Sequence, residues 1–181
     1  VLAAAIERKI VVCDELVVFD IDPAKCKKIK AQLKFPVKIV KSFNELLASK
    51  PAVFVEAAGQ AAVHQYYDKL LASKTDFIIM STGALLNLNT DSPKLHFPAG
   101  AIGGLDALSA AANVGFETVN LTTRKPPKAL NKTNTTEEVI YEGKAEEAAK
   151  LYPREMNVAV TLALTIKPHR VQVKVISDPK V

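Results

Sequence analysis

The stretch at residues 97–106, FPAGAIGGLD, contains three of the seven glycines in this chain of 181 residues. It follows a short apolar run at 94–97 and leads into an alanine-rich, helix-like segment at 105–112. Backbone without side chains lets a flat ligand approach closely, so this strand–turn–helix pattern could form the floor of a ligand site. The same pattern is also typical of a tight turn that only needs positive φ angles.

Two other groups of small and polar residues follow apolar runs in the same way. One group follows residues 52–56 and the other follows residues 76–80, where two strands are expected to end. Hydroxyls and bare amides there can bind polar ligand groups without filling the pocket, although ordinary strand-to-helix turns use the same residue types. The candidate ligand-binding residues of these two groups are Ala57, Gly59, Ser81, Thr82 and Gly83.

An acidic residue, Asp20, ends a further apolar run at 15–20. At the end of the second strand of a dinucleotide-binding fold, such an acid accepts hydrogen bonds from the adenosine ribose. Its charge would also repel a 2′-phosphate, which favours NAD over NADP as the cofactor. Asp20 could instead be an ordinary turn or helix-capping acid, because no glycine-rich fingerprint precedes it by about 20 residues. The first glycine of the chain is Gly59.

The elements that must position these residues alternate between strand and helix. Apolar runs at 15–20, 37–40, 52–56 and 76–80 are typical of buried parallel strands, and the segments 1–10, 23–33, 43–49 and 60–73 are typical of helices. Asp22 and Ser42 are predicted N-caps. We therefore predict an α/β fold with a Rossmann-type parallel sheet, whose ligands lie at the carboxyl ends of the strands. The crossover at 85–93 is too broken for a good helix.

After Thr118 the pattern changes to that of a smaller α+β unit. Strands are expected at 117–125, 139–142 and 170–177, the last one half-exposed, with helices at 144–151 and 156–166 and an exposed loop at 125–136. We predict an antiparallel layer whose open strand edges pair with another subunit. The predicted domains are residues 1–104, which bind NAD(P), and residues 105–181.

The composition of the chain and the spacing of its charged, cysteine and histidine residues exclude several classes of protein or make them less favoured. The net charge is +5, but the lysines are scattered and aromatic residues are few, which disfavours a nucleic-acid interface. No apolar run is long enough for a membrane span, and Cys13 and Cys26 are typical of reduced thiols in a cytoplasmic protein. No cluster has metal-ligand spacing, so no metal is predicted. His64, His96 and His169 are not predicted to act as general bases.

Six segments in register resemble the L-aspartate dehydrogenase family over nearly the whole chain. They are VEAAGQAAV (55–63), IIMSTGAL (78–85), FPAGAIGGLDAL (97–108), LTTRKP (121–126), YEGKAEEAAKLYP (141–153) and NVAVTLAL (157–164). The resemblance implies an N-terminal Rossmann domain and a C-terminal domain that builds the substrate site and the subunit contacts of a homodimer. It also implies oxidation of L-aspartate with NAD or NADP to iminoaspartate, which hydrolyses to oxaloacetate and ammonia or feeds NAD biosynthesis.

The resemblance also implies roles for particular residues. Ala101 and Asn157 match family residues that contact the cofactor. The catalytic histidine of the family follows the Asp-Pro that matches residues 178–179, so it is expected beyond Val181. The two carboxylates of aspartate need cationic partners. Arg124 and Lys125 are candidates, although they could equally be surface charges that flank a strand.

The chain departs from the family pattern in several places. The glycine fingerprint and the catalytic histidine are absent and the crossover near 86–93 is short, which we expect to reflect residues outside this sequence. Glu155 stands where many members carry an asparagine, and an acid there would be unfavourable beside a dicarboxylate substrate. Two alternatives stay open. One is another amino-acid-pathway oxidoreductase, similar to homoserine dehydrogenase or dihydrodipicolinate reductase, and the other is a non-catalytic nucleotide-binding module.

Overall fold

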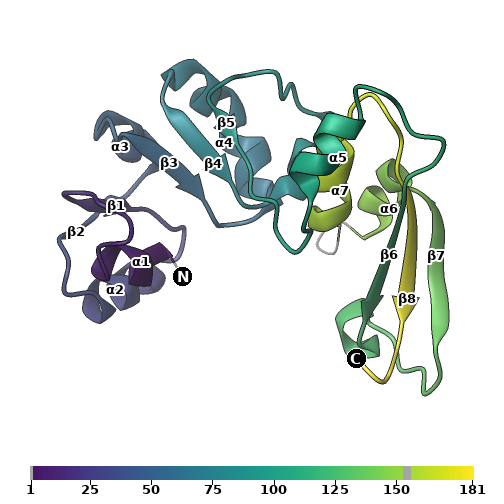
Figure 1. Ribbon diagram of the computed structural model, residues 1–181. Coiled ribbons are helices and arrows are strands. Elements are labelled where there is room, and N and C mark those ends of the chain that lie inside the picture. Colours follow the sequence, from purple (N-terminus) through teal and green to yellow (C-terminus); the bar gives the residue numbers. More distant parts are fainter. Residues whose placement is uncertain (1, 153–155) are drawn as a thin grey trace.

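The computed structural model describes residues 2–152 and 156–181. The first elements form a lobe at the N-terminus (Figure 1): α1 (Leu2–Glu7), β1 (Leu16–Val18), α2 (Pro23–Gln32) and β2 (Val37–Ile39). The predicted cap of α2 is confirmed, because Asp22 Oδ1 accepts a hydrogen bond from Ala24 N at 2.9 Å. Pro23 fills the first helical position, where a missing N–H costs nothing.

The next elements form the central part of the molecule. They are α3 (Phe43–Ala48), β3 (Val53–Glu56), α4 (Gln60–Ser73), β4 (Asp76–Ile79), the 3-10 helix η1 (Thr82–Asn87) and β5 (Leu95–His96). Ser42 caps α3 as predicted, since its Oγ accepts from Glu45 N at 3.2 Å. The crossover that lacked a helical pattern consists of η1 followed by irregular chain.

The parallel strands form two sheets, and this corrects the expectation of a single one. β1 pairs with β2, while β3, β4 and β5 pair in that order, all in parallel. Within the described residues, no strand is hydrogen-bonded to strands of both sheets, so the two sheets are not joined into one. The Rossmann-like alternation of parallel strands and helices is nevertheless as predicted.

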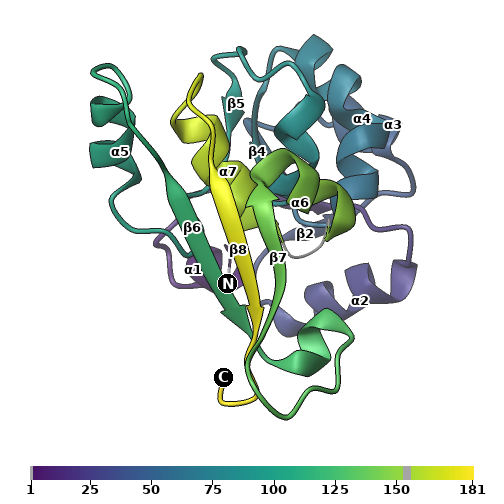
Figure 2. The same cartoon turned by 90° about the vertical axis from the view of Figure 1, so that its right-hand side faces the viewer.

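The second half contains α5 (Leu105–Ala111), β6 (Asn120–Lys125), the 3-10 helix η2 (Pro127–Leu130), β7 (Glu138–Lys144), α6 (Ala145–Leu151), α7 (Asn157–Thr165) and β8 (Gln172–Ser177). Figure 2 shows the three strands side by side, with α6 and α7 against the upper part of the sheet. The loop predicted to be exposed includes η2, whose Leu130 is buried.

The prediction of an antiparallel layer was wrong for one strand pair. The sheet order is β6–β8–β7, in which β7 and β8 are antiparallel but β6 and β8 are parallel. The chain reverses direction between β6 and β7 and again between β7 and β8, where the connection is α6 and α7. It returns between the first two strands, so β8 runs parallel to β6. As the central strand, β8 buries Val173, Val175 and Ile176, so the expectation of a half-exposed strand was also wrong.

Helix α7 packs into both hydrophobic cores. Val160 and Leu164 join the first core, which includes Phe77 and Leu85 of the central part. Other α7 side chains, among them Leu162, join the second core beside the β6–β8–β7 sheet. The N-terminal turn of α7 is therefore held against η1, far away in sequence.

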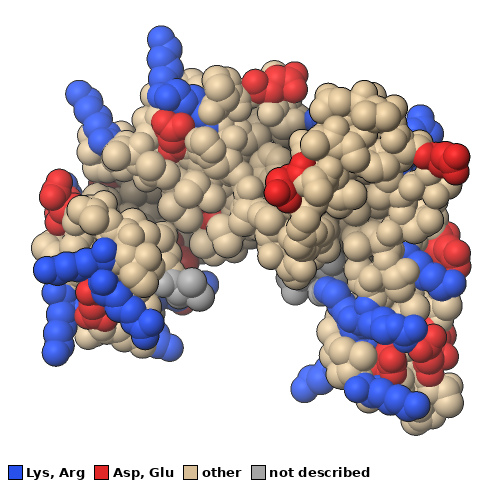
Figure 3. Space-filling model, viewed as in Figure 1, with Lys and Arg blue, Asp and Glu red and all other residues tan. Residues whose placement is uncertain are grey.

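Figure 3 shows the molecule as an arch, with most of the visible charged side chains on two projecting lobes and a largely uncharged middle. Along residues 2–152 and 156–181, no helix is both long and apolar enough to cross a membrane.

Candidate cofactor site

The carboxyl ends of β3 and β4 are joined by the side chain of Glu56, the last residue of β3. Its Oε1 accepts hydrogen bonds from Ala58 N at 2.8 Å, Gly59 N at 2.7 Å and Ser81 Oγ at 3.0 Å. Its Oε2 accepts from Ser81 N at 3.0 Å. One carboxylate thus holds both of the turns that the sequence indicated as ligand-binding. Sequence reasoning missed Glu56, because a dinucleotide-binding fold leads one to expect an acid after its second strand, where Asp20 was assigned, and not at the end of the strand at 52–56.

The start of α7 meets the second of these turns. Asn157 Oδ1 accepts a hydrogen bond from Gly83 N at 2.8 Å, and Asn157 O accepts from Thr82 Oγ1 at 2.9 Å. Thr161 Oγ1 donates to Thr82 Oγ1 at 3.0 Å. The structure therefore brings Asn157 against residues that lie 74 and 75 positions earlier in the chain.

Gly83 is a glycine because two side chains fill the space beside it. A Cβ at this position would lie 2.2 Å from Gln60 Nε2 and 2.8 Å from Asn157 Oδ1. Gly103 differs, since a Cβ there would meet no atom of the described residues within 4 Å. The missing side chain at Gly83 therefore allows Gln60 and Asn157 to pack closely against the backbone, whereas the missing side chain at Gly103 leaves open space among the described residues.

The glycine-rich stretch lies at the carboxyl end of β5, next to the end of β4 in the same sheet. Gly100 and Gly104 have φ angles of +67° and +72°, as expected for a tight turn. Ala101 is exposed between them. Phe97 packs against the first core and Ile102 against the second, so this stretch carries the chain from one core to the other.

Asp20 follows the end of β1 and takes part in a local turn. Its Oδ1 accepts a hydrogen bond from Asp22 N at 2.8 Å and lies 3.7 Å from Lys25 Nζ. Within the described part of the chain, its Oδ2 has no hydrogen-bond partner. Asp20 belongs to a different sheet from Glu56, and no polar contact between described residues joins the two carboxylates.

Arg124 and Lys125 do not join the residues around Asn157. β6 leads away from α7 toward the C-terminus (Figure 1), and these two residues lie at its far end. Arg124 forms ion pairs with Glu137 and with Asp178, the latter at 3.2 Å. The hydrogen bond and negative charge of Glu137, aided by Asp178, raise the pKa of Arg124. This placement favours the alternative of surface charges that flank a strand.

The three histidines lie apart from the Glu56 and Asn157 contacts. His64 is exposed on α4, and His169 Nε2 lies 2.8 Å from Ala112 O. His96 Nε2 lies 2.9 Å from Asp76 Oδ1. In residues 2–152 and 156–181, no group of three His, Cys, Asp or Glu side chains is arranged to hold a metal ion. Glu155 lies outside the described residues.

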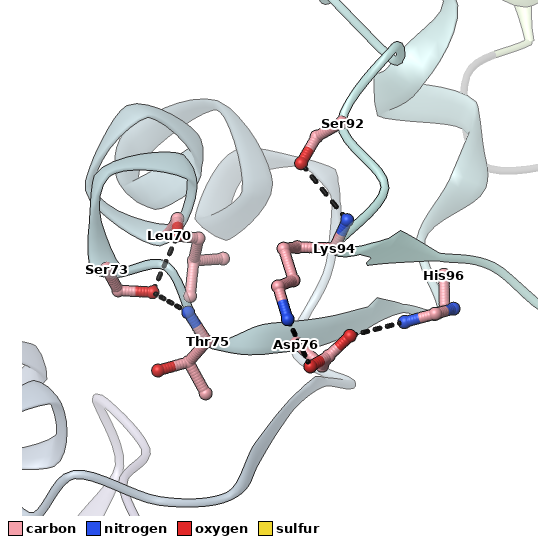
Figure 4. Close-up of polar contacts among 7 residues, drawn as sticks. All are labelled: Leu70, Ser73, Thr75, Asp76, Ser92, Lys94 and His96. Atoms are coloured by element: carbon pink, nitrogen blue, oxygen red, sulfur yellow. Dashed lines mark hydrogen bonds and ion pairs between the residues drawn. The ribbon is translucent and has the colours of Figure 1, made fainter.

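Asp76, the first residue of β4, accepts hydrogen bonds from two cationic or titratable partners. Figure 4 shows Lys94 and His96 both pointing at its carboxylate, with Lys94 Nζ 3.1 Å from Oδ2. The hydrogen bond from His96, followed by that from Lys94, lowers the pKa of Asp76 below its usual value of 3.8. This cluster lies at the start of β4, at the opposite end of the strand from Ser81.

Replacing Asp76 with Asn should make the acid limb of the stability–pH curve less steep. A carboxyl whose pKa is lowered by folding stabilises the folded state above its unfolded-state pKa, and this contribution is lost as pH falls through the folded-state pKa. The wild type should therefore lose unfolding free energy below pH 3.8 more steeply than Asp76→Asn. Urea unfolding over a pH series measures this. Asp14→Asn, which removes an exposed carboxyl, is the control. Parallel wild-type and Asp76→Asn curves would contradict the expectation.

Comparison with known proteins places these features in a family. The model of the homoserine dehydrogenase NAD binding domain matches residues 3–104, and that of the aspartate dehydrogenase C-terminal domain matches residues 106–181. The L-aspartate dehydrogenase of Thermotoga sp. (strain RQ2) is 38% identical over 141 residues, which cover 72% of this chain and 58% of that protein. That of Methanopyrus kandleri is 35% identical over 182 residues, covering 93% of this chain and 68% of that protein.

The fold is also similar to a solved structure. The crystal structure of aspartate dehydrogenase from Thermotoga maritima matches with a TM-score of 0.73 at 30% identity, covering 94% of this chain and 81% of that one. The chain spans little more than half the length of several relatives, for example 58% and 53% of the proteins from Thermotoga sp. and Methanothermobacter thermautotrophicus. Matches over both halves, together with a shared fold, lead to one conclusion: the chain belongs to the L-aspartate dehydrogenase family.

Proposed function

We propose that this protein is an NAD(P)-dependent L-aspartate dehydrogenase. Its product would be iminoaspartate, which hydrolyses to oxaloacetate and ammonia or feeds NAD biosynthesis. The observation that carries this proposal is the meeting of three elements in a chain of this family: the two turns held by Glu56 and the start of α7 at Asn157. When bound, NAD(P) would accept the hydride that leaves the substrate Cα.

The two parts of the chain would have different functions. Residues 1–104 would bind the cofactor, and residues 105–181 would contribute to the substrate site and the subunit contacts. The ranges of the two matching family models support this division. Asn157 would be an exception to this division. It belongs to the second part, but its hydrogen bond from Gly83 N places it beside the turn at 81–83, where it would contact the cofactor.

The residues present fit a dinucleotide. Asp20 keeps one carboxylate oxygen for the adenosine ribose, and the hydrogen bond to Asp22 N holds its side chain in place. Asn157 uses Oδ1 for Gly83 N, which leaves its Nδ2 hydrogens for the cofactor. Thr82 is 1% exposed and its hydroxyl already donates and accepts, so its role would be to hold α7. The remaining proposed contacts are Ala57, Gly59, Ser81, Gly83 and Ala101.

The activity is tested with purified full-length protein, L-aspartate and NAD or NADP. Formation of the reduced nucleotide, followed by its absorbance, together with release of ammonia, is the expected result. Homoserine and dihydrodipicolinate-type substrates test the related oxidoreductases. Turnover of one of these without turnover of aspartate would replace the proposal. Nucleotide binding without any turnover would favour the non-catalytic module.

Replacing Asp20 with Ser should shift nucleotide preference from NAD toward NADP. The change removes the charge that repels a 2′-phosphate, and Lys25, whose Nζ lies 3.7 Å from Asp20 Oδ1, would remain to attract it. The ratio of NAD to NADP affinity should fall by about tenfold. Asp22→Ser is a matched control, because it removes a neighbouring carboxylate but keeps a good N-cap on α2. An unchanged ratio in Asp20→Ser would show that Asp20 does not bind the ribose.

We further propose a cytoplasmic homodimer that assembles through the second half of the chain, with no nucleic-acid or membrane partner. Support comes from the sheet, since β6 and β7 each pair only with β8 among the described strands and leave their outer edges open. Light scattering during size-exclusion chromatography measures the oligomeric state. A monomer at micromolar concentration would contradict this assembly.

A further inference from the structure

The carboxylate of Glu56 is fixed in place by four donors on two turns. Three are the backbone amides of Ala58, Gly59 and Ser81, and the fourth is the Ser81 hydroxyl, at distances between 2.7 and 3.0 Å. Both oxygens are engaged, so the group cannot rotate away from these turns without breaking several hydrogen bonds at once. The negative charge therefore stands at a defined position between the ends of β3 and β4.

Among the described residues, no lysine, arginine or histidine side chain pairs with this carboxylate. Its partners within residues 2–152 and 156–181 are amides and a hydroxyl. Glu56 is half-buried, so water screens its charge less than it would on an open surface. A charged group that binds over the two turns would consequently feel the field of this carboxylate.

We propose that Glu56 raises the affinity of this site for the oxidised nicotinamide ring relative to the reduced one. The inference rests on the proposed cofactor function and adds that the turns at 57–59 and 81–83 face the nicotinamide end, because Asp20, the proposed ligand of the adenosine ribose, follows a strand of the other parallel sheet. The oxidised ring carries a positive charge and the reduced ring is neutral. A fixed carboxylate attracts the first and is nearly indifferent to the second. Glu56 is thus a positioning residue for the turns and an electrostatic determinant of the cofactor's redox state.

A merely structural role would have a different signature. If Glu56 only held the turns, its loss would weaken the binding of NAD⁺ and NADH by the same factor, because both share every part except the ring charge. If its charge also acts on the ring, removing the charge must weaken the binding of NAD⁺ more than the binding of NADH. The ratio of the two dissociation constants therefore separates the two roles, whatever happens to each affinity alone.

The experiment compares Glu56→Gln with the wild type. NADH binding is titrated by its fluorescence, and NAD⁺ binding by competition. We expect Glu56→Gln to weaken NAD⁺ binding about three- to tenfold more than NADH binding. Glu45→Gln is the control, because Glu45 is also an acid that accepts from a backbone amide, Lys41 N at 3.0 Å, but lies at α3. Its ratio should equal that of the wild type.

Three further measurements add to the test, and the first needs no variant, so it stands even if Glu56→Gln folds poorly. In the wild type, NAD⁺ should bind at least as tightly as NADH. In Glu56→Asp, which keeps the charge, the ratio should stay closer to the wild type than in Glu56→Gln, even if both affinities fall. Amide exchange at Gly59 and Ser81 in the nucleotide-free protein should quicken in Glu56→Gln, because a primary amide cannot accept all four hydrogen bonds.

The outcomes are distinct. Equal losses for NAD⁺ and NADH in Glu56→Gln, or a wild type that strongly favours NADH, would overturn the electrostatic role and leave the proposed enzyme function intact. A wild type that binds neither nucleotide would overturn the proposed function, and this inference with it.

Discussion

Replacing Gly83 with Ala should lower the free energy of unfolding by about 2 kcal/mol and weaken NAD binding by about tenfold or more. The added Cβ would lie 2.8 Å from Asn157 Oδ1 and 2.2 Å from Gln60 Nε2. Gln60 ends in a flexible amide, but Asn157 begins a helix that packs into both cores. The turn must therefore move away from α7, and the hydrogen bond from Gly83 N to Asn157 Oδ1 is lost.

Gly103→Ala is the control for stability, since the Cβ that it adds meets no atom within 4 Å in the described part of the chain. Urea unfolding gives the two unfolding free energies, and titration with NAD gives the affinity of Gly83→Ala. Equal stability of the two variants would show that the contacts around Gly83 relax without cost. In that case Asn157 and Gly83 would not be coupled in the way that the hydrogen bond indicates.

Replacing Asn157 should have an equally large effect, and two substitutions separate its two roles. Asn157→Ala removes the acceptor for Gly83 N and should cost about 1–3 kcal/mol of stability, in addition to cofactor affinity. Asn157→Asp keeps an acceptor oxygen for Gly83 N, and a negative charge in the first turn of α7 is compatible with the helix dipole. Its stability should stay near that of the wild type.

Both Asn157 variants should bind NAD about tenfold or more weakly, because each lacks the Nδ2 donor proposed to face the cofactor. Thermal or urea unfolding and NAD titration of the same preparations provide the comparison. If Asn157→Asp binds NAD as tightly as the wild type, the residue serves only to hold Gly83. A large loss of stability in Asn157→Asp would instead show that the carboxylate cannot take over the hydrogen bond.

Much of the first half of the chain could be predicted because its signals are local. Asp22 and Ser42 cap the helices that follow them, as their positions before Pro23 and Phe43 indicated. α4 spans the predicted residues 60–73, and β3 and β4 end at the small-residue groups. Caps and hydrophobic periodicity involve residues within a few positions of one another, so the sequence shows them directly.

Strand pairing in the second half was harder to predict. The alternating pattern of residues 170–177 is the same for an edge strand as for a central one. β8 becomes the central strand only because the chain, after α6 and α7, returns between β6 and β7. There it is parallel to β6 and buried along most of its length. Likewise, apolar runs predict buried parallel strands but do not indicate whether β1 and β3 lie in one sheet.

The sequence by itself determined the helix caps, the approximate strand ends and the small-residue turns at 57–59, 81–83 and 97–106. Only the tertiary structure decided which of these features meet. It set Glu56 against Ser81, 25 positions away, and Asn157 against Gly83, 74 positions away, and it turned Arg124 toward Glu137 and Asp178. The physical reason is that caps and periodicity arise from neighbouring residues, whereas these contacts exist only once α7 has packed into both cores and the strands have paired.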